Sequence, residues 1–557
     1  MDTAQLLQYL RDSSLEEGRA YIQEQIAELT NSTAIGEAIA DEALRVLYTP
    51  FVSLKIAEQL IFYGDIIHST SSHALGLKAK GDALVQIGHF QAAMECLDAS
   101  GEEFLQLGDE GNWARSRISW VAACTWLGRV EEALAEAERA RAVFQRLNEY
   151  YWVCVIEHNM AWIYEQIGRD HDAIKLYENM RAIFPTLTDQ SQSAIARSIA
   201  LAEGNQALVL VRLGNFAKAH HLLQQAHASS IAINETDLVI NVEIDLADLD
   251  YMRGYYGSAL RRYYHVRDSM VQNNLDDPLL LAELKLRIAN CLVKLNRTQE
   301  ASALAREAVE LNRSTGMSLS TGNALREYAT ALVASNRLQE ALSILDEAWT
   351  LFSRSGFEPH AFATKLQQAE LLLESGSASG AYEQAHLASE YFHERGLVAR
   401  SVRANLVMAG ALIANLQQRT ELSPEVEQRP GSLQDALALC RQAALQARQY
   451  HLQEEVYKSH YLLGHISLLE ENSTRAARHF SAAIAQIERI LDDLIYDLSP
   501  SFMYTTWRVY EDMIALCLQQ SQIERAFDYL EQARSMALRQ YLNKSSVDRE
   551  EGQKEQS

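Results

Sequence analysis

The segment IEHNMAWIYEQIGRDHDAIKLYENMRAIFP, residues 156–185, places two helix-length apolar patterns on either side of a glycine. Ala161 and Ala173 are small residues, which suit the point where the two helices of a hairpin cross closely. Gly168 lies between the patterns, where a helix end commonly needs a left-handed residue. Pro185 cannot continue the second helix. The segment therefore predicts two antiparallel helices joined by a tight turn.

The small residue of the second helix recurs along the chain, most often at a step of 40 residues. Its copies are Ala93, Ala133, Ala173, Ala219, Ala259, Ala301, Ala341, Ala381, Ala436, Ala476 and Ala526. Fixed self-similarity of this kind is the signature of a repeat architecture, in which each unit buries its apolar face against its neighbours. A step of 40 leaves room for two helices of about 17 residues in each unit.

The repeat resembles the tetratricopeptide repeat. Counted from residue 154, positions 8, 11, 15, 20, 24 and 32 are occupied by Ala161, Tyr164, Gly168, Ala173, Tyr177 and Pro185. The resemblance implies an all-α fold, a right-handed superhelical solenoid of antiparallel helix hairpins. It also implies a concave face that is built from the first helix of each hairpin.

Breaks in the repeat divide the chain into five parts. Two of the seven prolines, Pro424 and Pro430, lie in the longest step between repeat alanines and indicate an exposed loop. The final residues are polar, which is typical of disorder. The expected parts are a degenerate N-terminal helical cap (1–72), a regular array (73–415), the loop insertion (416–435), C-terminal repeats (436–542) and a disordered tail (543–557).

Composition restricts the partners and the compartment. A formal charge of -24 disfavours binding to the phosphate backbone of nucleic acids. The six cysteines form no CxxC pair, which fits a reducing compartment. The chain has no basic, apolar signal segment at its start and no run of 18 uncharged apolar residues. We therefore expect a cytoplasmic protein that contacts neither nucleic acid nor membrane.

The resemblance also implies which residues line the groove. Tetratricopeptide positions 2, 5, 6, 9, 12 and 13 face the concave side. Among the residues at these positions are His158, Asn159, Trp162, Glu165, Asn205, Arg212, Asn241, Asp245, Arg287, Asn290, Lys294 and Arg326. Asn159 and Asn205 share position 6, where asparagine in this family bonds the backbone of an extended peptide. Trp162 is either a groove anchor or a packing residue.

The sequence shows no catalytic constellation. HExxH, GxSxG and CxxC motifs are absent. Gly76 and Gly81 have the glycine spacing of a phosphate-binding loop, but Asp82 stands where that loop requires lysine. Cys154 and His158 are one helical turn apart, but two further metal ligands are missing. We expect no enzyme activity, no metal and no cofactor.

The segment from Met503 to Leu542 resembles the last repeat of bacterial proteins that join tetratricopeptide arrays to a CHAT domain, a caspase-like cysteine peptidase. Arg508, Tyr510 and the stretch ERAFDYLEQARSMAL carry this resemblance. The residues after Leu542 contain no His-Gly step and no cysteine. The resemblance implies a bacterial regulatory arm that works with a CHAT peptidase supplied in cis or in trans.

Two functions follow from these patterns. The first is a non-enzymatic scaffold that binds a protein or peptide partner in its concave groove, as the regulatory arm of a CHAT-type system. The alternative is the small-ligand-sensing module of a bacterial signal-transduction or transcription regulator, since similar repeats serve in that role. The alternative predicts a closed pocket lined by aromatic residues.

Overall fold

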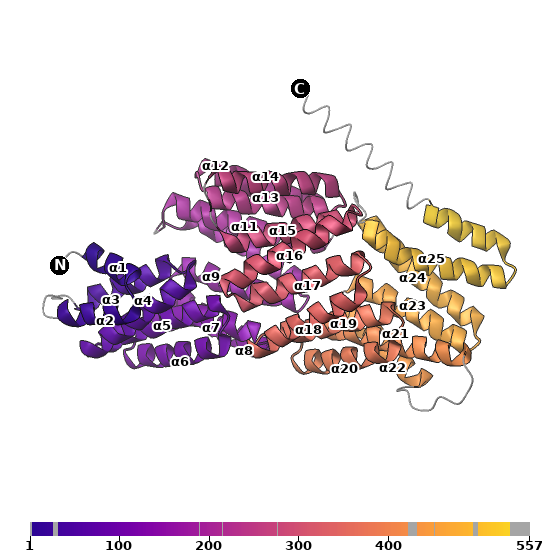
Figure 1. The fold of residues 1–557 in the computed structure, drawn as a ribbon, viewed down its shortest axis with the longest axis horizontal. Coiled ribbons are helices and arrows are strands. Elements are labelled where there is room, and N and C mark those ends of the chain that lie inside the picture. Colours follow the sequence, from indigo (N-terminus) through magenta and orange to yellow (C-terminus); the bar gives the residue numbers. More distant parts are fainter. Residues whose placement is uncertain are drawn as a thin grey trace, which may run out of the picture.

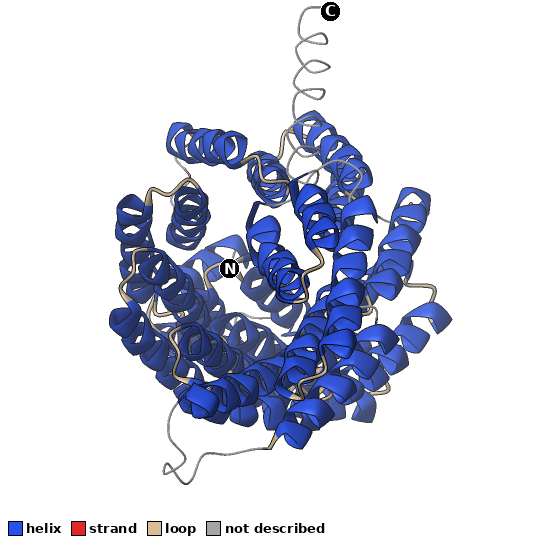
Figure 2. Cartoon of the chain, turned by 90° about the vertical axis from the view of Figure 1, so that its right-hand side faces the viewer, coloured by secondary structure: helices blue, strands red, loops and turns tan. Residues whose placement is uncertain are grey.

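A computed structural model describes residues 3–534, except for 26–31, 189, 214, 274, 276, 422–431, 451 and 494–499. In these residues the secondary structure is helical throughout, without strands (Figure 2). The helices follow one another as a solenoid along the long axis of the molecule (Figure 1). The predicted all-α class and the right-handed solenoid of antiparallel hairpins are confirmed.

Four helices precede the regular array. They are α1 (Thr3–Asp12), α2 (Leu15–Gln25), α3 (Ser32–Arg45) and α4 (Pro50–Ile66). Leu6, Ile22 and Tyr63 are completely buried in an apolar core that these helices share with the start of the array. This part of the chain corresponds to the predicted N-terminal cap.

The array consists of consecutive helix pairs. In chain order the helices are α5 (Thr70–Ile87), α6 (Phe90–Gln106), α7 (Glu110–Trp126), α8 (Val130–Arg146), α9 (Tyr150–Gln166), α10 (Asp170–Ile183), α11 (Gln192–Arg212), α12 (Phe216–Ala232), α13 (Thr236–Met252), α14 (Tyr256–Gln272), α15 (Pro278–Lys294), α16 (Thr298–Thr315), α17 (Ser318–Ala334), α18 (Leu338–Arg354), α19 (Glu358–Glu374), α20 (Ala378–Glu394), α21 (Val398–Glu421), α22 (Leu433–Gln449), α23 (Gln453–Leu469), α24 (Ser473–Asp493) and α25 (Pro500–Gln519). Residues 523–534 are also helical and follow α25.

The repeat alanines lie where the sequence predicts. All eleven are buried, ten of them completely. Most helices of the array have 17 residues, as the step of 40 predicts. Gly168 follows α9 with φ 76°, and Asn336 takes the same left-handed conformation after α17 with φ 59°. Pro185 lies in a short 3-10 turn, η1 (Phe184–Thr186), directly after α10.

We expect Ala219→Leu to lower the free energy of unfolding by about 1 to 3 kcal/mol, because added methylenes overpack a dense helix crossing. Ala219 is completely buried on α12. Ala217 is exposed on the same helix, so Ala217→Leu is the matched control. Urea denaturation measures both variants. Equal losses in the two would show that Ala219 is not at a helix crossing.

The solenoid touches itself across distant repeats. The ring of Phe90 lies edge-on to that of Phe357, with centroids 5.1 Å apart, and Trp126 lies 5.3 Å from His360. A Cβ atom at Gly128 would approach Tyr391 Oη to 3.3 Å. Block α5–α8 therefore meets α18–α20 near the middle of the molecule (Figure 1). We call the contacts among Gly88, Phe90, Trp126, Gly128, Phe357, Pro359, His360 and Tyr391 the seam.

The predicted loop, 416–435, is shorter in the structure, and the predicted tail, 543–557, lies outside the described residues. Helix α21 continues to Glu421 and α22 begins at Leu433, so helix occupies both ends of the stretch 416–435 that was predicted as loop. Residues 422–431 and the predicted tail 543–557 lie outside the described residues.

Helix α11 is long and apolar enough to cross a membrane, judged by length and composition alone. Half of its most apolar window is buried, and Ala207 and Leu210 pack in the core that α11 shares with α12 and α13. These properties are those of a core helix in a repeat. No other helix in the described ranges passes the same test.

Candidate functional site: the concave face

The groove residues predicted from the sequence lie on first helices of the hairpins. His158, Asn159, Trp162 and Glu165 are on α9, and the remaining eight are on α11, α13, α15 and α17. Many of them form polar contacts from one first helix to the next. The side chains of the concave face therefore connect neighbouring repeats, and part of this face is also accessible to solvent.

The first of these contacts join α11 to helices α9 and α10 of the preceding repeat. The amide nitrogen Nδ2 of Asn205 is 2.8 Å from Nε2 of His158. Arg212 donates to Glu165 at 2.9 Å and to Asp170 at the same distance. These charges and polar groups satisfy one another across the repeat boundary.

Further hydrogen bonds between first helices join α15 to α17 and α17 to α19. Asn290 Nδ2 donates to Glu327 at 3.2 Å, and Arg326 Nε donates to Gln367 Oε1 at 3.0 Å. Lys294 and Asn241 are exposed on their helices. The predicted residues thus divide into interlocked groups and free surface groups.

Asn159 and Asn205 occupy the same helix face, but their amides already have partners. Asn159 Nδ2 donates to the backbone carbonyl of Ile118 on α7 at 2.9 Å. Trp162 packs against Trp126 of the seam, with ring centroids 4.9 Å apart. In this arrangement, Asn159 and Trp162 hold repeats together, which favours the packing interpretation of Trp162.

A pocket of about 330 Å³ lies between α11, α13 and α15, and its lining includes Asp248, Arg287 and the aromatic side chains of Tyr251 and Tyr263. Asp248 accepts hydrogen bonds from Arg287 and from the hydroxyl of Tyr263. Asp245 lies beside this group on α13, and its burial and the charge of Asp248 raise its pKa to about 7. Arg287 also donates to Glu283 at 2.6 Å. The carboxylate of Asp245 makes no ion pair with any residue that the structure describes.

A larger pocket, about 470 Å³, opens on the concave face between α17, α19 and α21. Its polar lining comes from Arg326, Glu327, Thr330, Gln367, Glu370, Glu374, Arg400 and Arg403, and its apolar lining from Ala329, Val333, Leu345, Ala363, Leu366 and Leu371. Of these residues, Arg326 and Glu327 stand at concave positions 5 and 6 and were predicted from the sequence to line the groove.

The other polar residues of this pocket were missed for two different reasons. Gln367, Glu370 and Arg403 stand at positions 6, 9 and 2 of the next two repeats, so the same frame would have found them. Arg400 and the nearby His360 precede position 1 of their repeats. They lie in the first turn of helices that are longer than the usual unit, and the family's position numbers do not extend there.

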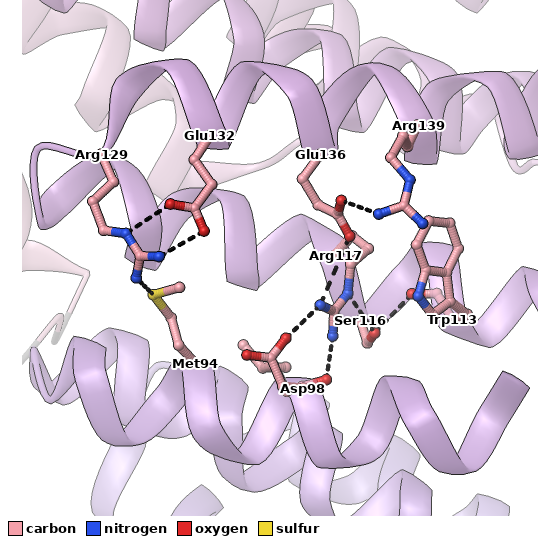
Figure 3. A network of polar contacts seen from close by, with 10 residues as sticks. Met94, Asp98, Trp113, Ser116, Arg117, Arg129, Glu132, Glu136 and Arg139 are labelled. Atoms are coloured by element: carbon pink, nitrogen blue, oxygen red, sulfur yellow. Dashed lines mark hydrogen bonds and ion pairs between the residues drawn. The ribbon is translucent and has the colours of Figure 1, made fainter. Parts of the chain in front are cut away.

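A second charged network lies between α6, α7 and α8 (Figure 3). At its centre, the guanidinium group of Arg117 is paired with groups of the chain itself. Arg117 is only 5% exposed and donates to Asp98 at 2.8 Å and to the backbone carbonyl of Leu97. Glu136 lies 3.9 Å from the same guanidinium and also pairs with Arg139 at 2.6 Å. Buried charge is tolerated here because each group has a partner.

Cys154, which the sequence places one helical turn from His158, is a buried thiol. Burial raises the pKa of Cys154 to about 12, so it remains a thiol at neutral pH. His158, which is paired with Asn205, has its pKa lowered by burial. Across the part of the chain that is described, no three His, Cys, Asp or Glu side chains are grouped as metal ligands.

Comparison with known proteins identifies the repeat. Family models described as tetratricopeptide repeat match residues 114–185 and 282–315. No curated protein sequence matches the chain.

Solved structures with a similar course of the chain have low sequence identity. A Rap protein complexed with competence and sporulation factor is 11% identical, with a TM-score of 0.45, over 70% of this chain and 99% of that one. Yeast Tom70 is 13% identical, with a TM-score of 0.43, over 87% and 96%.

A signal transduction ATPase with numerous domains from Pyrococcus horikoshii, which has a tetratricopeptide repeat sensor, is 12% identical, with a TM-score of 0.35, over 86% of this chain and 67% of that one. The two family matches fall on hairpins α7–α10 and α15–α16, whose buried alanines share their register with the rest of the array. The chain therefore carries tetratricopeptide repeats at residues 114–185 and 282–315, within an all-helical solenoid of antiparallel hairpins.

Proposed function

We propose that this chain is a non-enzymatic scaffold whose concave face binds a segment of a protein partner. The observation that carries the proposal is the open pocket between α17, α19 and α21, which continues the line of first helices. Its aliphatic floor and charged rim suit a side chain of a bound segment, with polar groups that fix its orientation. The pocket has no aromatic lining, unlike the pocket expected for a small-ligand sensor.

We further infer that the partner system is of the CHAT type, with the peptidase domain in cis or in trans. Arg508, Tyr510 and the described part of the resembling stretch, residues 524–534, lie in the last described hairpin, where Tyr510 is completely buried. The same hairpin exposes Leu518, Ile523 and Phe527 by 54%, 70% and 59%. A terminal repeat with an exposed apolar face supports the idea that another element covers it.

A cytoplasmic setting remains part of this proposal. All six cysteines are free in the structure, and five of them are buried. Free thiols used as small core residues support a reducing compartment.

Site-specific photo-crosslinking in extracts of the host tests the proposed function. A photoreactive residue is placed at Thr330, which is exposed and lines the pocket, and at Leu445, which is 70% exposed on α22. We expect a discrete protein adduct from position 330 and none of the same mass from position 445.

Two results would contradict the proposal. One is an identical set of adducts from both positions, which would indicate nonspecific contact. The other is the absence of any protein adduct together with a strong thermal shift caused by a metabolite, which would favour the ligand-sensor alternative.

A further inference from the structure

The concave face is rich in arginines, and most of them are neutralised within the chain. Arg212 pairs with Glu165 and Asp170, and Arg287 pairs with Asp248 and Glu283. In each case an opposite charge in contact offsets part of the desolvation penalty of the guanidinium group.

Arg326 and Arg400 differ from these neutralised arginines. Neither has a carboxylate within 4.0 Å among the residues that the structure describes. Arg326 donates to the neutral amide of Gln367, and Arg400 donates only weakly, at 3.5 Å, to the carbonyl of Pro359. Burial lowers the pKa of both guanidinium groups, although the charge of Glu327 opposes this shift at Arg326 and Arg400 lies over the ring of Phe392, 5.9 Å from its centroid.

The three acidic residues that line the pocket form no ion pair with Arg326 or Arg400. Arg403 at the rim pairs with Glu370 through two hydrogen bonds, one of them 2.8 Å long. Glu327 accepts the hydrogen bond from Asn290, and Glu374 is exposed at the edge of the pocket. The pocket thus holds two cations that its own acids do not pair with.

His360 is a buried, neutral neighbour of the two arginines. Its Nδ1 atom is buried without a hydrogen-bond partner, and its ring lies against Trp126 and Phe352. Burial, together with the charges of Arg400 and Arg326, lowers the pKa of His360 to about 3, so it is neutral at physiological pH.

We propose that Arg326 and Arg400 form a subsite for an acidic side chain, aspartate or glutamate, of the segment that binds in the groove. The inference rests on the proposed scaffold function and specifies the chemistry of the partner. A carboxylate entering the pocket would meet two guanidinium groups that offer charge-assisted hydrogen bonds. The aliphatic residues Val333, Leu366 and Leu371 would contact the methylene groups of the same side chain or an apolar neighbour.

A fluorescein-labelled hexaglutamate peptide is the probe, with hexalysine as the opposite-charge control and citrate as a free small anion. Binding is measured by fluorescence anisotropy on the full chain. We expect hexaglutamate to bind and hexalysine not to bind at the pocket. The double variant Arg326→Gln, Arg400→Gln should bind hexaglutamate at least about tenfold more weakly, the effect of losing charge-assisted hydrogen bonds.

The matched control is Arg306→Gln, which removes a positive charge from an exposed site on the second helix α16. This variant should keep the wild-type affinity. Thermal melting tests whether the two arginines instead stabilise the fold, because the melting temperature would then fall in the double variant. We expect the double variant to melt no lower than the wild type, because unpaired buried charge does not stabilise the fold.

Three results would overturn the subsite. They are equal hexaglutamate affinity in all three proteins, a clear loss of melting temperature in the double variant, and binding of citrate without binding of hexaglutamate. Failure of the subsite is distinguishable from failure of the scaffold function. A crosslinked partner at position 330 that the double variant retains at full yield would leave the scaffold function standing and reject the acidic side chain.

Discussion

Phe357→Ala is expected to lower the free energy of unfolding by about 3 to 5 kcal/mol, the usual cost of deleting a fully buried aromatic side chain. Phe357 is 1% exposed and contacts Phe90 across the seam and Phe352 at the end of the preceding helix, α18. Removing the ring leaves a cavity between two distant parts of the array. Urea denaturation followed by circular dichroism measures the loss.

A double-mutant cycle separates the seam from the hairpin. Phe90→Ala and Phe357→Ala are made singly and together, and their coupling energy is expected to be about 0.5 to 1.5 kcal/mol, as for other edge-on aromatic pairs. Strict additivity of the two losses would show that the rings do not interact in solution. The array would then be an open solenoid.

Gly88→Ala should cost about 2 to 5 kcal/mol, the sum of backbone strain and overpacking. Gly88 has φ 94°, a conformation that alanine rarely adopts. In addition, a Cβ atom at this position would overlap the ring of Phe357. The variant therefore strains the turn after α5 and pushes the seam apart. The fall in the urea midpoint measures both effects together.

Gly108→Ala is the control that isolates the contact. Gly108 has φ 71°, and a Cβ atom there would meet no atom within 4 Å. It should therefore show only the backbone penalty, about 1 to 2 kcal/mol. If both glycine variants lost the same stability, the close approach of Gly88 to Phe357 would be disproved.

The hairpins could be predicted from the sequence because their determinants are local. Ala173, Gly168 and Pro185 each act within one repeat, and the structure places all three as expected. The seam could not be predicted in this way. It depends on small rotations between neighbouring repeats that add up over many units, and no single repeat contains that information.

The sequence predicted which helices carry the groove residues, but it did not predict which contacts their side chains make. Position numbers placed His158, Asn205 and Arg326 on the correct helices. They could not show that His158 and Asn205 bond each other, because that depends on which side chain of the next repeat comes opposite. Arg400 was missed because α21 begins at Val398, several residues before position 1 of its repeat, and the family's position numbers do not cover that first turn.

The seam also changes the order in which the chain can fold. In an open array, each repeat needs only its neighbours, so folding can start anywhere and spread outward. Here the contact between Phe90 and Phe357 requires all repeats between them to be in place first. Contacts that are distant in sequence form slowly, since the loop between them must close before they contribute. During synthesis, the apolar edge around Phe90 therefore stays uncovered until the chain has been extended as far as Phe357.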